Sequence, residues 1–498
     1  MGTPTTKCMQ CAWAGAVSLL REPTVSAPGP DRSEQKSAAC GASRARQNIL
    51  IREWHMAGID AHKEAHAWRA VALLCCLFAL SFLDRMVLAL VVDPVRTSLG
   101  VSDTQISLLF GLGFVVVYVL AGFPAAQLVD SGRRRQVLLG GVLLWSGATF
   151  CSAFAASYPM LVACRSGVAV GEAVLMPAAM SLISELFTKE RRTLPTTVYT
   201  LTGVMMGAGS FIVGAGALKL AEMISPEVGV EPWRIMFVIV AIPGPILAGL
   251  FAWLVKEPPR QIQEDGEPGG PTASLAEFFS HFGSRITLYL PIFIGTGASF
   301  TVALGMSAWG PTMLTREHGV ADTSAGLFFG LFAIAGALVG MLAVTPLVRL
   351  LGAKSRVRGA ILTAILLNLT VLPLLALVVG GGDTRLVLAG IAIGTCGSIA
   401  TAAFTPIIMQ AVTPTPFLGR MSALYLMFNN VLGMGLGPIL VSSLAASSTS
   451  ERNIGEALTI VAWSAIAVSL TCYVFALWRL RSVVQPDPAI AATSSQPV

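Results

Sequence analysis

Residues 159–187 read PMLVACRSGVAVGEAVLMPAAMSLISELF, an apolar run long enough to cross a bilayer as a helix. The run contains two opposite charges, Arg165 and Glu172. They are seven positions apart, about two helical turns, so both side chains point to one face of the helix. A second charged pair, Asp84 and Arg85, lies in an earlier apolar run. Because charges at membrane depth are costly, we expect these four residues to face a cavity and form the working site.

The composition is that of an integral membrane protein. The chain has 498 residues, of which 54% are hydrophobic and 12% are charged, and its mean hydropathy is +0.72. A soluble protein carries about a quarter charged residues, so this composition excludes a soluble fold. The formal net charge of +6 does not indicate nucleic-acid binding, because the basic residues cluster at the ends of apolar runs.

Twelve apolar runs follow one another from residue 69, and each is predicted to be a helix because a helix satisfies its own backbone in lipid. The runs are 69–93, 106–128, 137–156, 159–187, 194–220, 235–255, 287–314, 324–349, 358–380, 386–412, 418–445 and 456–479. A polar stretch separates the first six from the second six. Two related halves with a site at their interface are typical of transporters.

This pattern predicts five parts of the chain. The two membrane parts are 67–255 and 287–480, joined by a cytoplasmic loop, 256–286. The polar ends, 1–66 and 481–498, are predicted to be disordered cytoplasmic tails. Met56 is an alternative start, since the residues after it lead directly into the first apolar run.

The basic residues predict the orientation. The loops after the second, fourth, sixth, eighth and tenth runs, with the C-terminal flank, hold roughly sixteen Lys and Arg residues, and the alternate loops hold roughly six. Both termini and the central loop are therefore predicted to be cytoplasmic, in the inner (plasma) membrane. Trp309, near the outer end of its run, is predicted to anchor at the membrane–water interface.

We expect no metal, cofactor or nucleotide. Cys8 and Cys11 form a C-x-x-C with no second such pair and no nearby histidine, which does not predict a metal site. The chain lacks G-x-x-x-x-G-K-[ST], so ATP is not the expected fuel. A monomer is expected.

The charged residues suit proton coupling. In general the pKa of a carboxyl group rises when it leaves water and falls beside an arginine, so a cavity that opens to alternate sides would change both effects. Asp84 and Glu172 are therefore candidate proton carriers. Arg85 and Arg165, which keep their charge, are candidate ligands of an anion. The alternative is a structural ion pair that fixes helix packing. Asn429 could equally hold helices together or contact substrate.

Five stretches resemble a known family. They are LDRMVLALVVDPVRTSLGVSDTQISLLFGLGF (83–114), RSGVAVGEAVLMPAAMSLISELF (165–187), WRIMF (233–237), EPPR (257–260) and GRMSALYLMFNNVLGMGLGPILV (419–441). Over residues 69–480 the chain resembles a major facilitator superfamily transporter, and within it the bacterial spinster-like branch. This resemblance implies an all-α integral membrane fold of twelve transmembrane helices, in two pseudo-symmetric six-helix bundles that rock about a central cavity.

The resemblance also implies roles for single residues. Asp84, Arg85 and Glu172 match the residues that the family ties to proton coupling, and Arg165 matches the arginine before that glutamate. The stretch AQLVDSGRRR (126–135) resembles the gating motif G-x-x-x-D-R-x-G-R-R, in which Asp130 would engage a helix N-terminus of the other bundle. Arg134 and Arg135 match its basic end. Ala126, Ser131 and Arg133 depart from the motif, which puts the inner gate in doubt.

The sequence therefore predicts a proton-coupled secondary transporter, not an enzyme, for a small anionic organic molecule. An amphipathic, lysolipid-like substrate is one option, and a sugar acid taken up by an organic-anion importer is the other. Two further alternatives are a polytopic membrane enzyme, which would need a clustered nucleophile or base, and a non-transporting sensor. The expected partners are the substrate, protons and the lipid bilayer.

Overall fold

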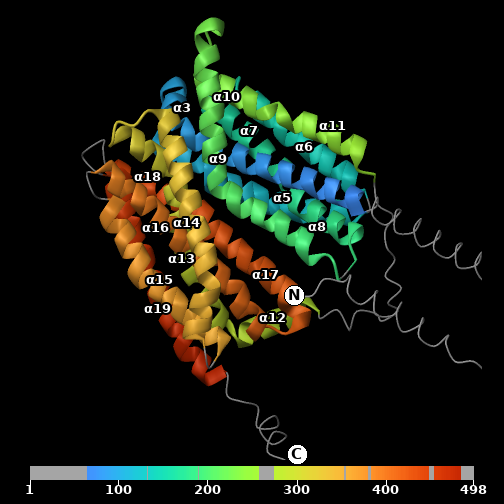
Figure 1. Cartoon of the computed structure of the whole chain (residues 1–498), viewed down its shortest axis with the longest axis vertical. Helices are drawn as coiled ribbons and strands as arrows, with labels where there is room; N and C mark the ends of the chain where they lie inside the picture. Colours follow the sequence, from blue (N-terminus) through green and yellow to red (C-terminus); the bar gives the residue numbers. More distant parts are fainter. Residues whose placement is uncertain are drawn as a thin grey trace, which may run out of the picture. The chain divides into compact units, whose positions relative to one another are not determined.

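The computed structural model describes residues 64–131, 133–188, 190–256, 274–352, 355–379, 383–447 and 454–483, and within these ranges it is helical without strands. Among these described residues, ten helices are long and apolar enough to cross a membrane. Two further helices, α6 (Arg134–Ser152) and α15 (Arg356–Val379), occupy the places of the third and ninth predicted runs. Together they make the twelve membrane helices that the sequence predicts. Figure 1 shows their arrangement.

The first half contains six membrane segments, several of them built from two helices. In chain order they are Glu64–Leu90, ending in η2 (Leu88–Leu90); α4 (Asp103–Phe110) with α5 (Leu112–Asp130); α6; α7 (Tyr158–Glu172) with α8 (Leu175–Leu186); α9 (Thr193–Val228); and α10 (Pro232–Ala241) with α11 (Pro243–Leu254). A short helix, α3 (Val92–Leu99), follows the first segment.

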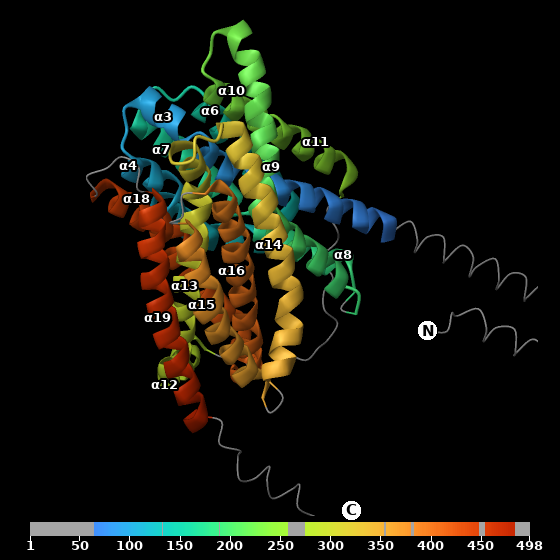
Figure 2. The same ribbon diagram turned by 60° about the vertical axis from the view of Figure 1, so that its left-hand side comes forward.

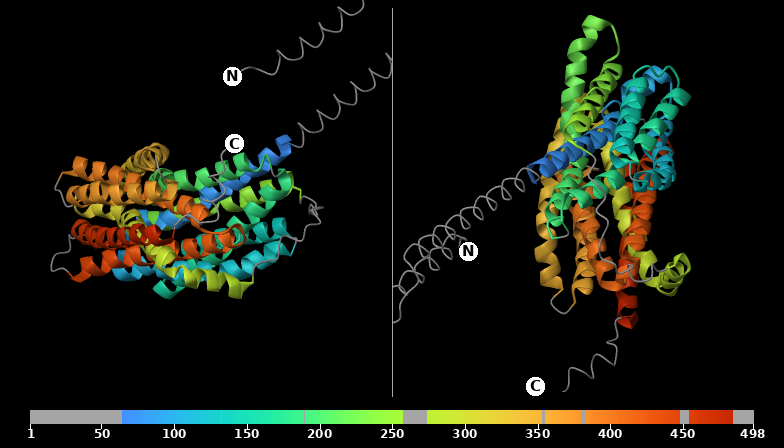
Figure 3. Two further views of the ribbon diagram at one scale, coloured as in Figure 1. Left: turned by 90° about the horizontal axis from the view of Figure 1, so that it is seen from below. Right: turned by 90° about the vertical axis from the view of Figure 1, so that its right-hand side faces the viewer.

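The second half repeats this plan. Its segments are α13 (Ile286–Arg316), α14 (Asp322–Leu351), α15, α16 (Thr384–Val412), α17 (Thr415–Asn429) with η3 (Asn430–Leu436) and α18 (Gly437–Ser447), and α19 (Ile454–Val483). In Figure 1 and in the left view of Figure 3, most helices coloured blue to green lie to the right of most helices coloured yellow to red. The predicted two-bundle fold is thus confirmed, while the domain boundaries at residues 66, 255, 286 and 480 stay predictions.

The bundles meet along α9 and α14, which lie side by side in two views (Figures 1 and 2). Small residues allow this approach, because a Cβ atom built on Gly330 would lie only 3.2 Å from the carbonyl oxygen of Ala208. The rings of Phe211 and Phe329 cross the same interface, with centroids 4.7 Å apart.

A second contact joins α4 and α5 to η3 and α18. Ser107 donates a hydrogen bond to the carbonyl oxygen of Pro438 at 3.0 Å. A Cβ atom built on Gly111 would lie 3.1 Å from the carbonyl oxygen of Gly435, so the two backbones touch here. Gly111 interrupts the second segment, and η3 is a π-helical stretch in the eleventh. The two irregular stretches therefore face each other across the interface.

The structure differs from the sequence-based expectation at three places. The segment α9 continues to Val228 instead of ending near residue 220, until Gly229 adopts φ +67° and ends it. The polar stretch 256–286 contains an additional helix, α12 (Leu275–Ser284), which begins with a capping box between Ser274 and Glu277. Trp309 is not an interface anchor: it is 1% exposed and donates a hydrogen bond to the carbonyl oxygen of Pro438 at 3.1 Å.

Candidate functional site

Four charged side chains from two helices meet inside the first bundle. Asp84 and Arg85 lie near the end of the first segment, and Arg165 and Glu172 lie on α7. Asp84, Arg165 and Glu172 are each at most 2% exposed. The structure thus brings together the four residues that the sequence analysis selected.

Asp84 pairs with Arg165. The Arg165 Nη1 atom lies 3.2 Å from Asp84 Oδ1 and 3.1 Å from the Asp84 carbonyl oxygen, so the arginine binds both the side chain and the backbone of its partner. Thr149 of α6 donates a further hydrogen bond to Asp84 Oδ2. This carboxylate is therefore fixed by three elements, the first segment, α6 and α7.

Arg85 pairs with Glu172. The Arg85 Nε atom lies 2.5 Å from Glu172 Oε2, and the glutamate side chain is fully buried while that of Arg85 is 15% exposed. The second carboxylate oxygen, Oε1, has no hydrogen-bond partner within the described part of the chain. A carboxylate oxygen without a hydrogen-bond partner can accept a proton.

A close contact between helices places Glu172. A Cβ atom built on Gly171 would lie 2.6 Å from the carbonyl oxygen of Gly141, so only glycine allows α6 and α7 to approach this closely. Because Gly171 precedes Glu172, this contact fixes the position of the Glu172 backbone relative to α6.

Aromatic rings surround the arginines, a feature that the sequence analysis missed. The guanidinium carbon of Arg85 lies 4.9 Å from the ring centroid of Tyr118, 5.5 Å from that of Phe114 and 5.7 Å from that of Phe82. The guanidinium carbon of Arg165 lies 5.6 Å from the Phe114 ring centroid. Such distances allow cation–π attraction. Phe114 and Tyr118 are four residues apart on α5, so their spacing predicts that both rings share one face of the helix. In an apolar helix this is weak evidence for a binding site.

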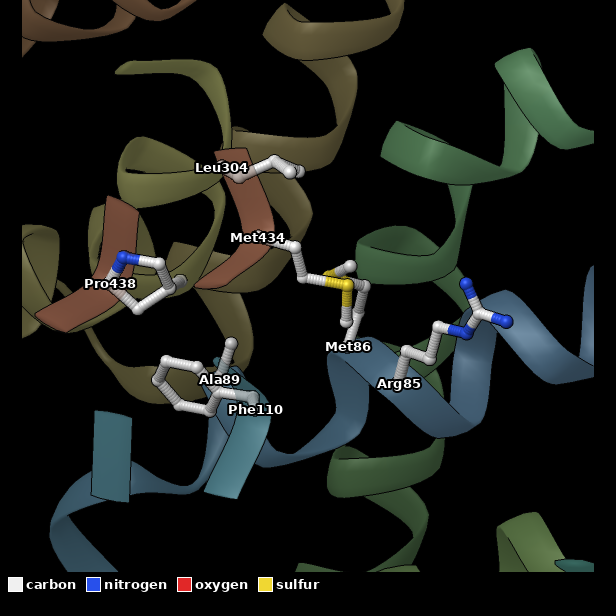
Figure 4. Close-up of a pocket in the computed structure, with 8 residues that line it drawn as sticks. Arg85, Met86, Ala89, Phe110, Leu304, Met434 and Pro438 are labelled. Carbon is white, nitrogen blue, oxygen red and sulfur yellow. The ribbon is translucent and has the colours of Figure 1, made fainter. Parts of the chain in front are cut away.

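Arg85 also borders a small pocket between the two bundles (Figure 4). The pocket is lined from the first half by Arg85, Met86, Ala89 and Phe110, and from the second by Leu304, Ala308, Met434 and Pro438. In Figure 4 the side chains of Met86 and Met434 overlap in the view of the pocket, and the guanidinium of Arg85 points away from them. The lining is apolar apart from this single cation.

The other predicted site residues lie apart from this cluster. Asn429 is 5% exposed, and its Nδ2 atom donates to the Tyr425 hydroxyl at 2.8 Å; it does not line the inter-bundle pocket. Of the predicted gating residues, Arg134 lies 3.1 Å from Glu185 and Arg135 donates to the carbonyl oxygen of Ala252, both within the first half. The side chain of Asp130 lies outside the described part of the chain.

A second ionic cluster joins the two halves, and its two arginines, Arg96 and Arg316, belong to the alternate loops that hold few basic residues. Arg316, at the end of α13, reaches Asp93 of α3 with Nη2 at 2.5 Å and Asp103 of α4 with Nη1 at 2.7 Å. Arg96 lies 3.5 Å from Asp103 on the first-half side. We call these four residues the Arg316 cluster.

Comparison with known proteins identifies the fold and the family. The model of the Major Facilitator Superfamily matches residues 74–438. An MFS-type efflux pump of Mycolicibacterium smegmatis is 28% identical over 85% of this chain and 95% of its own length. Protein spinster homolog 1 of Bos taurus is 26% identical over 78% of this chain and 74% of its own length.

A solved structure has the same fold. It is a bacterial homologue of the human lysosomal transporter spinster, in an inward-facing and unoccupied conformation. The TM-score is 0.71 at 21% sequence identity, covering 85% of this chain and 99% of the other. This agreement supports the twelve-helix arrangement described above.

Proposed function

The chain belongs to the Major Facilitator Superfamily and is a spinster-like membrane transporter, and from that premise we propose that it couples the movement of a small anionic, amphipathic molecule to protons. The observation that carries the proposal is the Arg85–Glu172 pair beside the inter-bundle pocket. In this proposal Asp84 and Glu172 handle protons, and Arg85 and Arg165 bind or respond to the anion.

Competition for Arg85 would couple the two ligands. An anion that attracts the Arg85 guanidinium weakens its contact with Glu172. The buried carboxylate would then be an unpaired charge, which is costly, so it would take up a proton. Anion and proton would therefore occupy the site together. The free Oε1 atom of Glu172 leaves a place for that proton.

The pocket lining supports an amphipathic substrate over a sugar acid. Met86, Phe110, Leu304 and Met434 offer apolar contacts, and Arg85 is the single charged residue among those that line the pocket. The apolar lining suits the body of an amphipathic molecule, whose anionic group would have to draw the Arg85 guanidinium toward the pocket from its place beside Glu172. The hydroxyl groups of a sugar acid would lose hydrogen bonds to water here.

Alternating access is proposed from the distribution of contacts between the bundles. The Arg316 cluster and the Ser107–Pro438 hydrogen bond both lie toward the end of the bundles that carries α3. With the orientation that the basic residues predict, this end faces outward and is closed, and the termini lie in the cytoplasm. Rocking of the bundles would open it.

The test uses purified protein in vesicles with an imposed pH gradient. The two probes are a labelled lysophosphatidic acid, which is anionic and amphipathic, and a labelled glucuronate. Glu172→Gln should lose the gradient-driven part of lysophosphatidic acid flux, because its neutral amide cannot exchange a proton. Glu227→Gln is the matched control, since Glu227 lies exposed near the end of α9.

Unchanged gradient-driven flux in Glu172→Gln would remove this residue from the coupling mechanism. Flux of glucuronate, without flux of lysophosphatidic acid, would replace the amphipathic substrate by an organic anion of the sugar-acid type. Melting curves of both variants check that loss of flux is not loss of fold.

A further inference from the structure

The ring of Phe114 contacts both arginines of the charged cluster. Its centroid lies 5.5 Å from the Arg85 guanidinium carbon and 5.6 Å from that of Arg165, and the residue is 2% exposed. The Tyr118 ring stacks beside it, with centroids 6.0 Å apart and an interplanar angle of 17°. One apolar side chain is thus shared by two cations that belong to different ion pairs.

If nothing held the two arginines in place, each of them could bind either carboxylate. Asp84 and Arg85 are adjacent in the chain, and both face α7. Each arginine carries five N–H donors, so each could reach more than one carboxylate oxygen. The structure shows one arrangement, in which Arg85 binds Glu172 and Arg165 binds Asp84.

We propose that Phe114 is a positioning residue that keeps each arginine on its own carboxylate. The negative face of an aromatic ring attracts a guanidinium, and the attraction is stronger where water is excluded, as it is at this buried residue. An aliphatic side chain of similar size would fill the space but would not hold the cations.

This role matters for proton uptake, and it rests on the proposed function of Glu172 as a proton carrier. The charged groups that act on Glu172 are Arg85 and Asp84 of the first segment and Arg165 of α7. Tyr118 of α5 and Tyr199 of α9 lie around its partner Arg85. If Phe114 did not hold Arg165 on Asp84, both arginines could approach Glu172. A carboxylate near two cations gives up its proton more readily.

The test follows the infrared band of protonated carboxyl groups as a function of pH, on the purified full-length chain in lipid. The Glu172 band is the one that Glu172→Gln removes. Phe114→Leu keeps most of the volume and removes the π face, and Phe114→Ala removes both. The matched controls are Phe123→Leu and Phe123→Ala, because Phe123 lies on the same helix and is 67% exposed.

We expect Phe114→Leu to lower the pH at which the Glu172 band is half-formed by about one unit, a tenfold weaker proton affinity. The pH of half-maximal gradient-driven flux should move equally. The Phe123 variants should titrate as the unmodified chain does. A Phe114→Leu protein that folds, as judged by its size-exclusion profile, and titrates like the unmodified chain would overturn the proposal.

The outcomes separate the two proposals. If Glu172→Gln stops proton coupling and Phe114→Leu leaves the pH profile unchanged, only the role of Phe114 fails. If the Glu172 band moves in Phe114→Leu but Glu172→Gln keeps gradient-driven flux, the coupling role of Glu172 fails and Phe114 remains a positioning residue. A chain without any Glu172 band at any pH would overturn both.

Discussion

Single residues show where local sequence was informative and where it was not. Helical periodicity placed Arg165 and Glu172 on one face of α7, because that spacing is a property of the helix alone. The contacts of Phe114 and Trp309 depend on residues far away in the chain. Trp309 bonds to Pro438, 129 positions away, and nothing in its immediate sequence could indicate that partner.

Glu317 provides a prediction at the residue scale. It follows α13, and its Oε1 atom accepts a hydrogen bond from the Gly455 N–H at 2.9 Å, at the start of α19. Partial burial raises the pKa of this carboxyl above its usual range, although that hydrogen bond opposes the rise. The folded state therefore holds the proton more tightly than the unfolded state. Stability should fall as the pH rises through the interval between the ordinary and the raised pKa.

Glu317→Gln should remove this part of the pH dependence. The amide keeps an acceptor for the Gly455 N–H and carries no charge, so above the interval the variant should melt at a higher temperature than the unmodified chain. Melting followed by tryptophan fluorescence between about pH 4 and pH 8 measures the effect, because the interval lies above the usual carboxyl pKa. Equal slopes in both proteins would contradict the prediction, and Glu227→Gln serves as the control.

At the scale of elements, the length of the apolar runs predicts the membrane helices, because a segment in lipid must form its backbone hydrogen bonds internally and a helix does so. The helix α12 is not predicted, because the polar composition of 256–286 indicates a loop. Its capping-box signal, Ser274 followed three residues later by Glu277, was present in the sequence. The length of α9 was also misjudged, because hydropathy marks the bilayer and not the end of the helix.

Close helix contacts give an element-scale prediction. A Cβ atom built on Gly340 of α14 would lie 2.4 Å from the carbonyl oxygen of Cys396 on α16, whereas one built on Gly207 of α9 would meet nothing within 4 Å. Gly340→Ala should therefore destabilise the protein by about 1–3 kcal/mol through overpacking. Gly207→Ala should be close to neutral. Thermal midpoints in one detergent compare them, and equal midpoints would show that α14 can move away from α16 without cost.

At the scale of the whole molecule, the repeated plan of six segments indicated two halves, but not where they touch. The Arg316 cluster illustrates the limit. Its residues lie on α3 and at the ends of α4 and α13, where basic residues also set the orientation of the chain in the membrane. The sequence therefore does not indicate that they form ion pairs between the two halves. Only the folded arrangement brings α13 to α3 and α4.

The Arg316 cluster gives a whole-molecule prediction. Arg316 is 15% exposed and binds two carboxylates of the other half, so its replacement breaks both contacts at once. Arg316→Gln should increase the fraction of molecules open at this end. A cysteine introduced at Ala308, which lines the inter-bundle pocket, should then react faster with a membrane-impermeant maleimide added from outside.

The comparison needs two references. The chain without the introduced cysteine gives the background labelling of its own cysteines, and Arg385→Gln removes an exposed arginine near the start of α16. Unchanged labelling in Arg316→Gln would show that the other contacts hold this end closed without the ion pairs.

The meeting of Gly111 with Gly435 has a mechanical consequence. At this point the two backbones touch, and neither glycine contributes a side chain. The interlocking of side chains that usually opposes the sliding of packed helices is therefore reduced here. In the proposed rocking of the two halves, this contact would therefore resist a turn less than the α9–α14 contact does, where the rings of Phe211 and Phe329 pack against each other.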